Sequence, residues 1–95
     1  MVVGVLKLQL TIPENHSLKE KRSVRKRVQA RVAQQFNVAV TECGDQDLWQ
    51  SAVLGFSAAG TSVPVVEATL QKIVALIDDM GLVQVGESHS EILHF

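Results

Sequence analysis

The stretch Val2-Val-Gly-Val-Leu-Lys-Leu-Gln-Leu-Thr-Ile12 alternates from residue to residue, and the rest of the fold is built around it. One face carries Leu6, Leu8, Leu10 and Ile12. The other face carries Val5, Lys7, Gln9 and Thr11. A period of two residues over this length predicts a β-strand with one buried face. Pro13 cannot donate to a strand ladder, so we expect the strand to end there.

The next run of the chain predicts a helix. Ser17-Leu-Lys-Glu20 matches a capping box, in which the serine hydroxyl accepts from the glutamate N–H and the carboxylate reaches back. The helix should continue to about Gln35. Its apolar stripe, within roughly 120° of a helical wheel, consists of Leu18, Val24, Val28, Val32 and Phe36. Lys21 and Arg25 fall in the same arc, so we expect their stems to lie along apolar surface with their charged heads free.

The middle of the chain predicts a β-hairpin. The helix should end at Asn37, and residues 38–41 form a short second strand. The polar, glycine-containing run Glu42–Asp47 is typical of a turn. Residues 48–59 alternate again and predict a third strand. One of its faces carries Ala52, Leu54 and Phe56, and the other carries Trp49, Ser51, Val53 and Ser57.

The last third of the chain predicts a second helix and a final strand. Pro64 suits the first turn of a helix, and Gly81 stands where a left-handed cap belongs. The apolar positions between them repeat with helical spacing: Val66, Leu70, Ile73, Val74, Ile77 and Met80. Residues 82–85 and, after a turn or bulge at residues 86–88, residues 89–95 make the last strand or strand pair.

These elements follow one another in the order β-α-β-β-α-β. This order predicts an α+β protein with the ferredoxin-like βαββαβ sandwich, a four-stranded antiparallel sheet with two helices on one face. A chain of 95 residues allows a single domain, residues 1–95. The lone Cys43 excludes an intrachain disulfide and a tetrahedral cysteine site. We expect a cytoplasmic protein, because residues 1–10 lack the features of a signal peptide and no run approaches the ~20 apolar residues of a membrane span.

The charges are distributed unevenly along the chain. Residues 16–31 hold seven of the nine cations against one acid, Glu20, a net charge of +6, whereas the remainder sums to −7. Such polarity creates a local positive field on a nearly neutral molecule. The pattern has two interpretations, a helix that contacts phosphates, above all those of RNA, or a solvated helix rich in good helix formers. The candidate anion-binding or nucleic-acid-binding residues are His16, Ser17, Lys19, Lys21, Arg22, Arg25, Lys26, Arg27 and Arg31. Within this set, Lys19, Lys21, Arg22 and Arg25 are the strongest candidates.

Trp49 is the only tryptophan and has two interpretations. It could stack on a nucleobase or anchor an interface, or it could be a partly buried packing residue. RNA-recognition modules of this topology stack bases on aromatic residues of the first and third strands. The first strand here has none, and Phe56 should face the core. The sequence therefore favours phosphate contacts over base stacking.

No complete catalytic or metal-binding constellation is visible, so we expect a non-catalytic protein without a cofactor. Glu42, Asp45 and Asp47 could supply oxygen ligands to Mg²⁺. Acidic residues are, however, common in turns without any metal, because their side chains hydrogen-bond the turn backbone. The three histidines, His16, His89 and His94, lack a zinc spacing, and Cys43 has no base partner in view.

Two stretches carry a resemblance to a known family: Ser17-Leu-Lys-Glu-Lys-Arg22, and Phe36-Asn-Val-Ala-Val-Thr-Glu42 with Asp45-Gln-Asp-Leu-Trp49. There the chain is similar to the YlxP-like family, small bacterial proteins classed as a domain of unknown function. The resemblance covers nearly all of the chain and implies a ferredoxin-like fold. The family's genes often lie near those for translation initiation and ribosome maturation factors, which implies RNA or a ribosomal particle as partner. It supplies no catalytic residues.

Two other functions stay open at this stage. A small phosphoryl-handling enzyme of acylphosphatase-like topology would need an arginine after the first strand and an asparagine in the third, and both are missing. A homodimeric interaction protein is also compatible, because ferredoxin-like sheets have open edges and Val3, Val5 and Val53 leave the uncovered face partly apolar.

Overall fold

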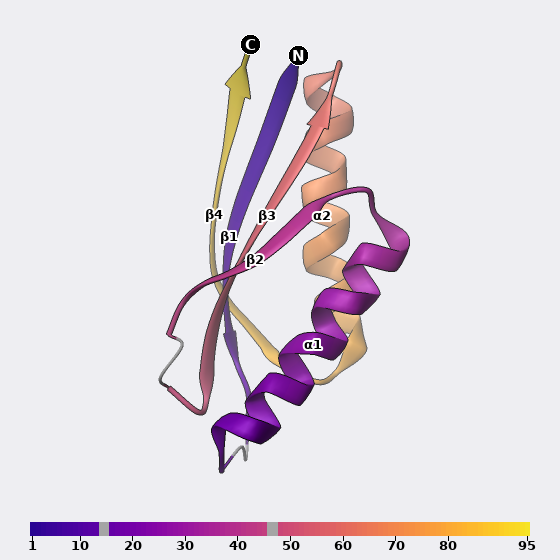
Figure 1. The fold of residues 1–95 in the computed structure, drawn as a ribbon. Coiled ribbons are helices and arrows are strands. Elements are labelled where there is room, and N and C mark those ends of the chain that lie inside the picture. The colour runs from indigo at the N-terminus through magenta and orange to yellow at the C-terminus, as the bar shows by residue number, and fades with distance from the viewer. Residues whose placement is uncertain (14–15, 46–47) are drawn as a thin grey trace.

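The structure is a computed structural model that describes residues 1–13, 16–45 and 48–95. The strands are β1 (Val2–Thr11), β2 (Ala39–Gly44), β3 (Ser51–Gly60) and β4 (Gln84–His94), and the helices are α1 (Leu18–Gln35) and α2 (Val63–Met80). All neighbouring strands are antiparallel, in the order β2-β3-β1-β4 (Figure 1). The ferredoxin-like prediction is therefore confirmed.

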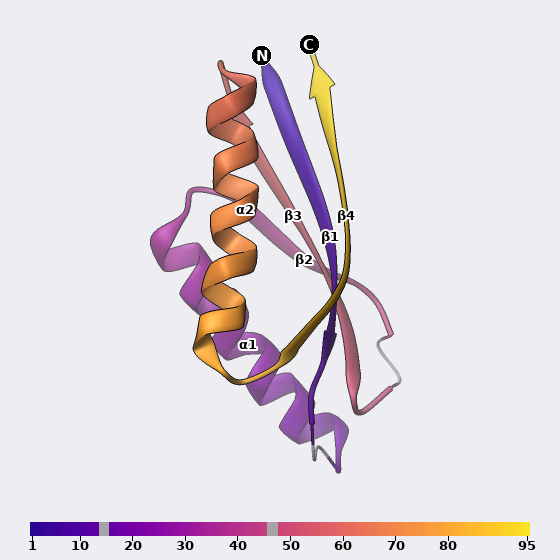
Figure 2. The ribbon, with the colours of Figure 1, turned by 180° about the vertical axis from the view of Figure 1, so that it is seen from behind.

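Both helices cover the same face of the sheet (Figure 2), and the buried residues alternate accordingly. The register places Leu6 opposite Phe56 and Leu8 opposite Leu54, so that their side chains share the helix-covered face. The buried core combines this face with the apolar stripes of the helices: Leu6, Leu8, Leu10, Ile12, Val28, Val32, Ala52, Leu54, Phe56, Val66, Leu70, Ile73 and Ile77. The alternation predicted from residues 2–12 is what builds this core.

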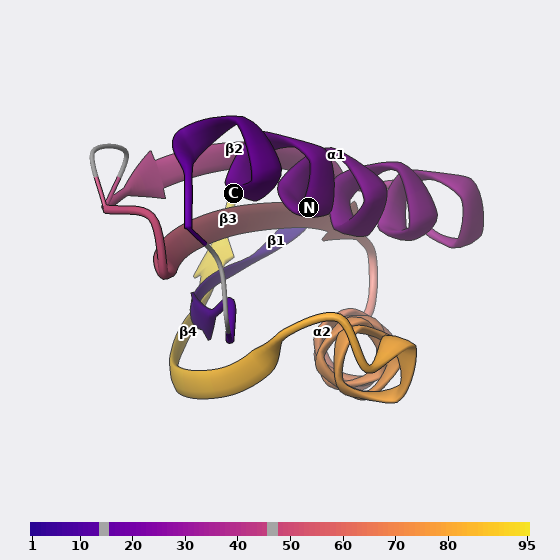
Figure 3. The same ribbon diagram turned by 90° about the horizontal axis from the view of Figure 1, so that it is seen from below.

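The helices divide the sheet between them. α1 contacts β2, whereas α2 contacts β1, β3 and β4, as the view from below shows (Figure 3). The expected caps are present: Ser17 precedes α1, and Gly81 follows α2 with a left-handed φ of 68°. Val3, Val5 and Val53 lie half-buried on the uncovered face, as predicted. Neither helix combines the length and apolar character needed to cross a membrane within the described residues.

The hairpin between β2 and β3 differs from the prediction at both ends. β2 continues to Gly44, so Glu42 and Cys43 belong to a strand rather than to the turn. Glu42 pairs with Leu54, and the register shifts before Gly44. β3 begins at Ser51 instead of residue 48. Its partner β1 ends opposite that position, and beyond it the Ile12 N–H donates to the Gln50 carbonyl without extending the strand ladder. Residues 46–47 of the predicted turn lie outside the described residues.

The last element is one strand with a bulge, not a strand pair. Leu8 pairs with Ser88 but Leu10 pairs with Val85, so β4 has one residue more than β1 across this interval. Gly86 lies in the bulge, where a Cβ atom would come within 3.3 Å of the Gln9 carbonyl oxygen. A glycine fits this close backbone approach. The bulge that the sequence left as one alternative is therefore confirmed.

Candidate nucleic-acid interface

The first turn of α1 is closed by its own side chains. The Glu20 N–H donates to the Ser17 hydroxyl over 3.1 Å, and the His16 N–H donates to the Glu20 carboxylate over 3.2 Å. The carboxylate thus reaches back one residue beyond the cap, a variant of the predicted capping box. Ser17 and Glu20 act here as helix caps, and the acid brings a negative charge to the helix dipole's positive end. The anion-binding capacity of this region therefore lies in its cations rather than in a bare helix end.

The seven cations of α1 separate into two groups by exposure. Lys19, Arg22, Lys26, Arg27 and Arg31 are exposed. Lys21 retains only 2% of its side-chain surface, and Arg25 only 19%. The two groups therefore have different surroundings.

Lys21 is buried and binds across the hairpin. Its ammonium donates to the backbone carbonyl of Asp45 and lies 3.8 Å from the Glu42 carboxylate. The expectation that its charged head would be free is wrong. The helical wheel correctly predicts that Lys21 is on the core-facing side of the helix. It cannot predict that the Glu42 carboxylate and the Asp45 carbonyl lie next to the Lys21 ammonium. Glu42 is a residue whose role the sequence did not reveal.

Arg25 shares the same acid. Its Nε lies 3.6 Å from the Glu42 carboxylate, and its Nη1 donates to the Gln29 side chain over 2.8 Å. Nε is buried and has no hydrogen-bond acceptor among the described residues. Glu42 therefore faces two cations at once, and both are held against the sheet. Lys21 and Arg25 attach α1 to β2, which limits their availability to an external anion.

Asp45 organises the turn at the end of β2. Its φ is +58°, a left-handed conformation that aspartate tolerates better than most residues. Its carbonyl accepts from the Leu48 N–H over 3.1 Å as well as from Lys21, and its carboxylate accepts from the Ser51 hydroxyl over 2.6 Å. These bonds assign Asp45 to turn geometry. No cluster of three or more potential metal ligands occurs within the described ranges, from which Asp47 is missing.

The exposed cations form a stripe along the outer side of α1. Lys19, Arg22 and Lys26 follow at i, i+3 and i+7, which places them within about 60° around the helix axis. None of the three forms an ion pair with another residue that the structure describes. We call these three residues the basic stripe. They carry the positive field of α1 into solvent.

Arg27 and Arg31 lie on a different flank of the helix. They line a hollow together with Asp79 and Met80 from the end of α2, and the Arg31 Nε donates to the Gln35 side chain over 3.3 Å. The neighbouring acid lowers the positive potential on this flank. Among the predicted anion-binding residues, the basic stripe is thus the group whose positive charge is least offset by neighbouring acids.

Trp49 lies outside the strands. It precedes β3, and 52% of its surface is exposed. The predicted position on a strand face is therefore wrong, since residue 49 lies in the connection that leads into β3. About half of the surface of Trp49 is thus accessible to a ligand.

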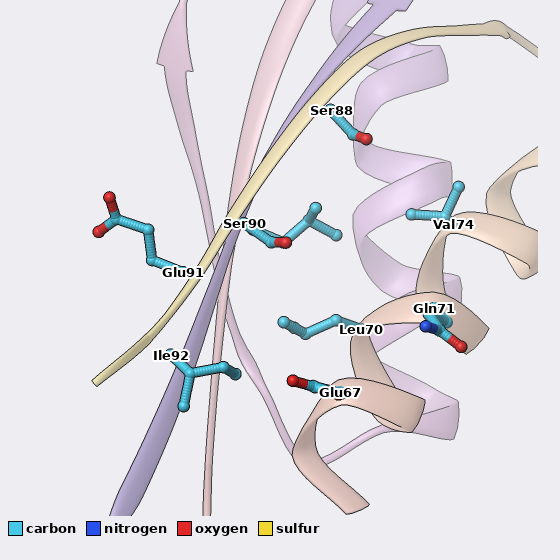
Figure 4. A pocket seen from close by; sticks show the side chains of 9 residues that line it. Glu67, Leu70, Gln71, Val74, Ser88, Ser90, Glu91 and Ile92 are labelled. Carbon is cyan, nitrogen blue, oxygen red and sulfur yellow. The ribbon is translucent and has the colours of Figure 1, made fainter. Parts of the chain in front are cut away.

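A separate groove runs between α2 and β4 (Figure 4). Its volume is about 310 Å³. Leu70, Val74 and Ile92 supply apolar walls, while Ser88 and Ser90 supply hydroxyl groups. Glu91 points to the other side of β4. The described lining contains acids but no cation, so this groove does not suit phosphate.

Solved structures with this fold differ widely in sequence. Protein YJCS from structural genomics superposes with a TM-score of 0.59 at 11% identity, covering 94% of this chain and 96% of that one. A VAO-type flavoprotein from Myceliophthora thermophila gives a TM-score of 0.56 at 13% identity, covering 97% of this chain but 16% of the flavoprotein. The de novo designed protein Foldit4 gives 0.53 at 15% identity, with 95% and 94% covered. At such identities the likeness shows the fold alone.

Sequence relatives are more informative about descent. The uncharacterized protein YlxP of Bacillus subtilis is 40% identical over 77 residues, which cover 81% of this chain and 84% of YlxP. The model of the family described as "Protein of unknown function (DUF503)" matches residues 3–90. The YlxP-like resemblance of the two sequence motifs is thereby confirmed, and the chain belongs to the DUF503 family.

Proposed function

We propose that the protein is a non-catalytic module that binds the phosphate backbone of RNA through the outer side of α1. The observation that carries the proposal is the basic stripe: Lys19, Arg22 and Lys26 are exposed, aligned and without an ion pair among the described residues. Phosphate contacts of this kind supply sequence-independent affinity for nucleic acids.

The placement of these cations opposes helix stability. Lys19 and Arg22 stand in the first turns of α1, where the helix dipole disfavours positive charge by about 0.3–1 kcal/mol each. Arg22 and Lys26 are an i,i+4 pair of like charge, which is also unfavourable. Selection for stability alone would place acids or neutral residues at these positions. A bound polyanion would attract these cations and so offset their unfavourable interactions with the helix dipole and with each other.

The buried cations support the same function indirectly. Lys21 and Arg25 hold one side of α1 against Glu42 and the Asp45 carbonyl. The basic stripe lies on the flank next to these anchors, since Arg22 and Arg25 are only about 60° apart around the helix axis. These bonds hold the helix backbone against β2, so a polyanion would meet the basic stripe on an element that is already positioned.

The proposal is tested by a matched pair of charge reversals. Arg22→Glu/Lys26→Glu changes the stripe, and Lys7→Glu/Lys72→Glu makes the same change in net charge with the two cations outside residues 16–31. Binding of a fluorescently labelled single-stranded RNA is measured by anisotropy between 20 and 300 mM salt. We expect the first variant to weaken binding at low salt by about tenfold or more.

The salt dependence separates specific contacts from a general charge effect. Each lost phosphate contact lowers the slope of log K against log salt by about 0.7, so the stripe variant should lose about 1.4. The control variant should keep the native slope. Equal losses in both variants would contradict a site on α1, and unchanged binding by the stripe variant would refute the proposal.

The cellular partner that we propose is a ribosomal particle, as the gene neighbourhood implied by the YlxP-like resemblance suggests. Such a partner is rich in exposed phosphates and lies in the cytoplasm. Sucrose-gradient sedimentation of cell extract tests this step. The native protein should migrate with ribosomal particles at low salt, and Arg22→Glu/Lys26→Glu should stay at the top of the gradient. Native protein that stays at the top as well would contradict it.

A further inference from the structure

A second concave site lies at one end of the uncovered sheet face, beside Trp49. The hollow has a volume of about 610 Å³ and is lined by Gln9, Thr11, Leu48, Trp49, Gln50 and Ser51. Leu48 and Trp49 expose 54% and 52% of their surfaces, respectively. Large apolar side chains exposed together at a concave surface are typical of a binding site.

The chemistry of the lining suits a neutral heteroaromatic ring. The indole and the leucine offer flat apolar contact, the two glutamines offer amide donors and acceptors, and the two hydroxyls do both. None of the described lining residues carries a charge. A nucleobase presents this combination of a stacking face and a hydrogen-bonding edge.

The hollow is fixed with respect to α1 by identified bonds. The Lys21 ammonium binds the Asp45 carbonyl, and the Asp45 carboxylate accepts from the Ser51 hydroxyl over 2.6 Å. The Gln50 carbonyl accepts from the Ile12 N–H over 2.9 Å. The start of α1 and the start of β3 consequently lie at the same end of the molecule (Figure 1). These hydrogen bonds connect the start of β3, which follows Trp49, to the helix that carries the basic stripe.

We propose that the hollow beside Trp49 binds an unpaired base of the RNA whose phosphates contact α1; this inference rests on the proposed function. The positive charge of the neighbouring helix and the polar amide and hydroxyl lining favour a nucleic-acid base over an apolar protein segment. The sequence disfavoured base stacking because the first strand has no aromatic residue and Trp49 was the only one expected on the open face of the third strand. The structure places the aromatic residue just before β3, at the edge of the sheet face.

The single tryptophan makes the site directly observable. The chain has no tyrosine, so its intrinsic fluorescence reports on Trp49. A base stacked on the indole should quench this emission. The probes are a 12-nucleotide oligouridylate and an abasic oligomer of the same length, which keeps the phosphates but has no bases. We expect quenching and an affinity roughly 5- to 150-fold higher with the oligouridylate.

Trp49→Ala should lower the affinity for the oligouridylate to that for the abasic oligomer and leave abasic binding unchanged. Leu93→Ala is the matched control, because Leu93 is an exposed apolar residue elsewhere in the molecule. Trp49→Phe keeps a stacking ring, so it should retain most of the preference for bases. If Trp49→Ala fails to fold, Gln50→Ala serves instead. It removes a side-chain amide from the hollow and should reduce the preference for the oligouridylate over the abasic oligomer.

The possible results separate the two proposals. Equal binding of both oligomers, unquenched emission and an unchanged Trp49→Ala variant would overturn the base site and leave phosphate binding by α1 intact. Failure of both oligomers to bind at low salt would overturn the proposed function and the base site together. A preference for bases that persists in Trp49→Ala and Gln50→Ala would show that the base lies elsewhere.

Discussion

Replacement of Lys21 by methionine tests whether a buried ammonium holds α1 to the hairpin. Methionine has a similar length and keeps the apolar stem, but it cannot donate to the Asp45 carbonyl. A hydrogen bond from a charged donor contributes about 1.5–3 kcal/mol to the free energy of unfolding. The carbonyl keeps the Leu48 N–H as a partner, and Glu42 keeps Arg25 at 3.6 Å.

These remaining partners limit the loss. A buried charge left entirely alone costs about 3–5 kcal/mol, whereas Glu42 is still paired and 18% exposed. We therefore expect Lys21→Met to lower the free energy of unfolding by about 2 kcal/mol. For a domain of this size, that change lowers the melting temperature by about 8–16 °C.

Urea unfolding followed by far-ultraviolet circular dichroism measures this loss. Lys26→Met is the control on the same helix, since Lys26 is exposed and its replacement should change stability by less than about 0.5 kcal/mol. A double-mutant cycle with Glu42→Gln should give a coupling below about 1 kcal/mol, because the main acceptor of Lys21 is the Asp45 carbonyl. Native stability in Lys21→Met, or a coupling to Glu42 that equals the full loss, would refute this reasoning.

Two further predictions concern the scaffold, and each is read from urea unfolding. Ser17→Ala removes the acceptor of the helix cap and should cost about 1 kcal/mol, whereas Ser23→Ala on the exposed side should be nearly neutral; equal effects would contradict the cap. Gly4→Ala places a Cβ 2.4 Å from Val66 and 3.1 Å from Leu70, which should cost about 1–3 kcal/mol. Val66→Ala should be less harmful in the Gly4→Ala background than alone, and simple additivity would argue against this clash.

The strongest periodic signals predicted the fold correctly. The alternation of Leu6, Leu8 and Leu10 produced the buried face of β1, and the helical spacing of Leu70, Ile73 and Ile77 produced the buried side of α2. These signals are local, since one strand or one helix suffices to bury or expose each residue. The order of the elements then restricted the topology to the observed sheet.

The errors arose where the answer depends on distant segments. Whether Lys21 is buried depends on how α1 crosses β2, and its partner Glu42 lies 21 residues later in the chain. The start of β3 depends on where β1 ends, because a strand needs a neighbour to complete its ladder. Trp49 was consequently assigned to a strand that begins only at Ser51. The candidate site also depends on distant segments. The cations are evident in the sequence, but which of them are buried and which are exposed is not.

The strand order also determines when the fold can form during synthesis. β1 is made first, yet one of its two edges is covered only by β4, and Val2 pairs with His94. At about 5–20 residues per second, the ribosome needs roughly 1–3 s to add the 15 residues that follow Met80. During this interval one edge of β1 lacks its partner strand and can associate with other chains. The second edge of β1 is therefore covered only after β4 has been made, and association with other chains should be strongest before that point.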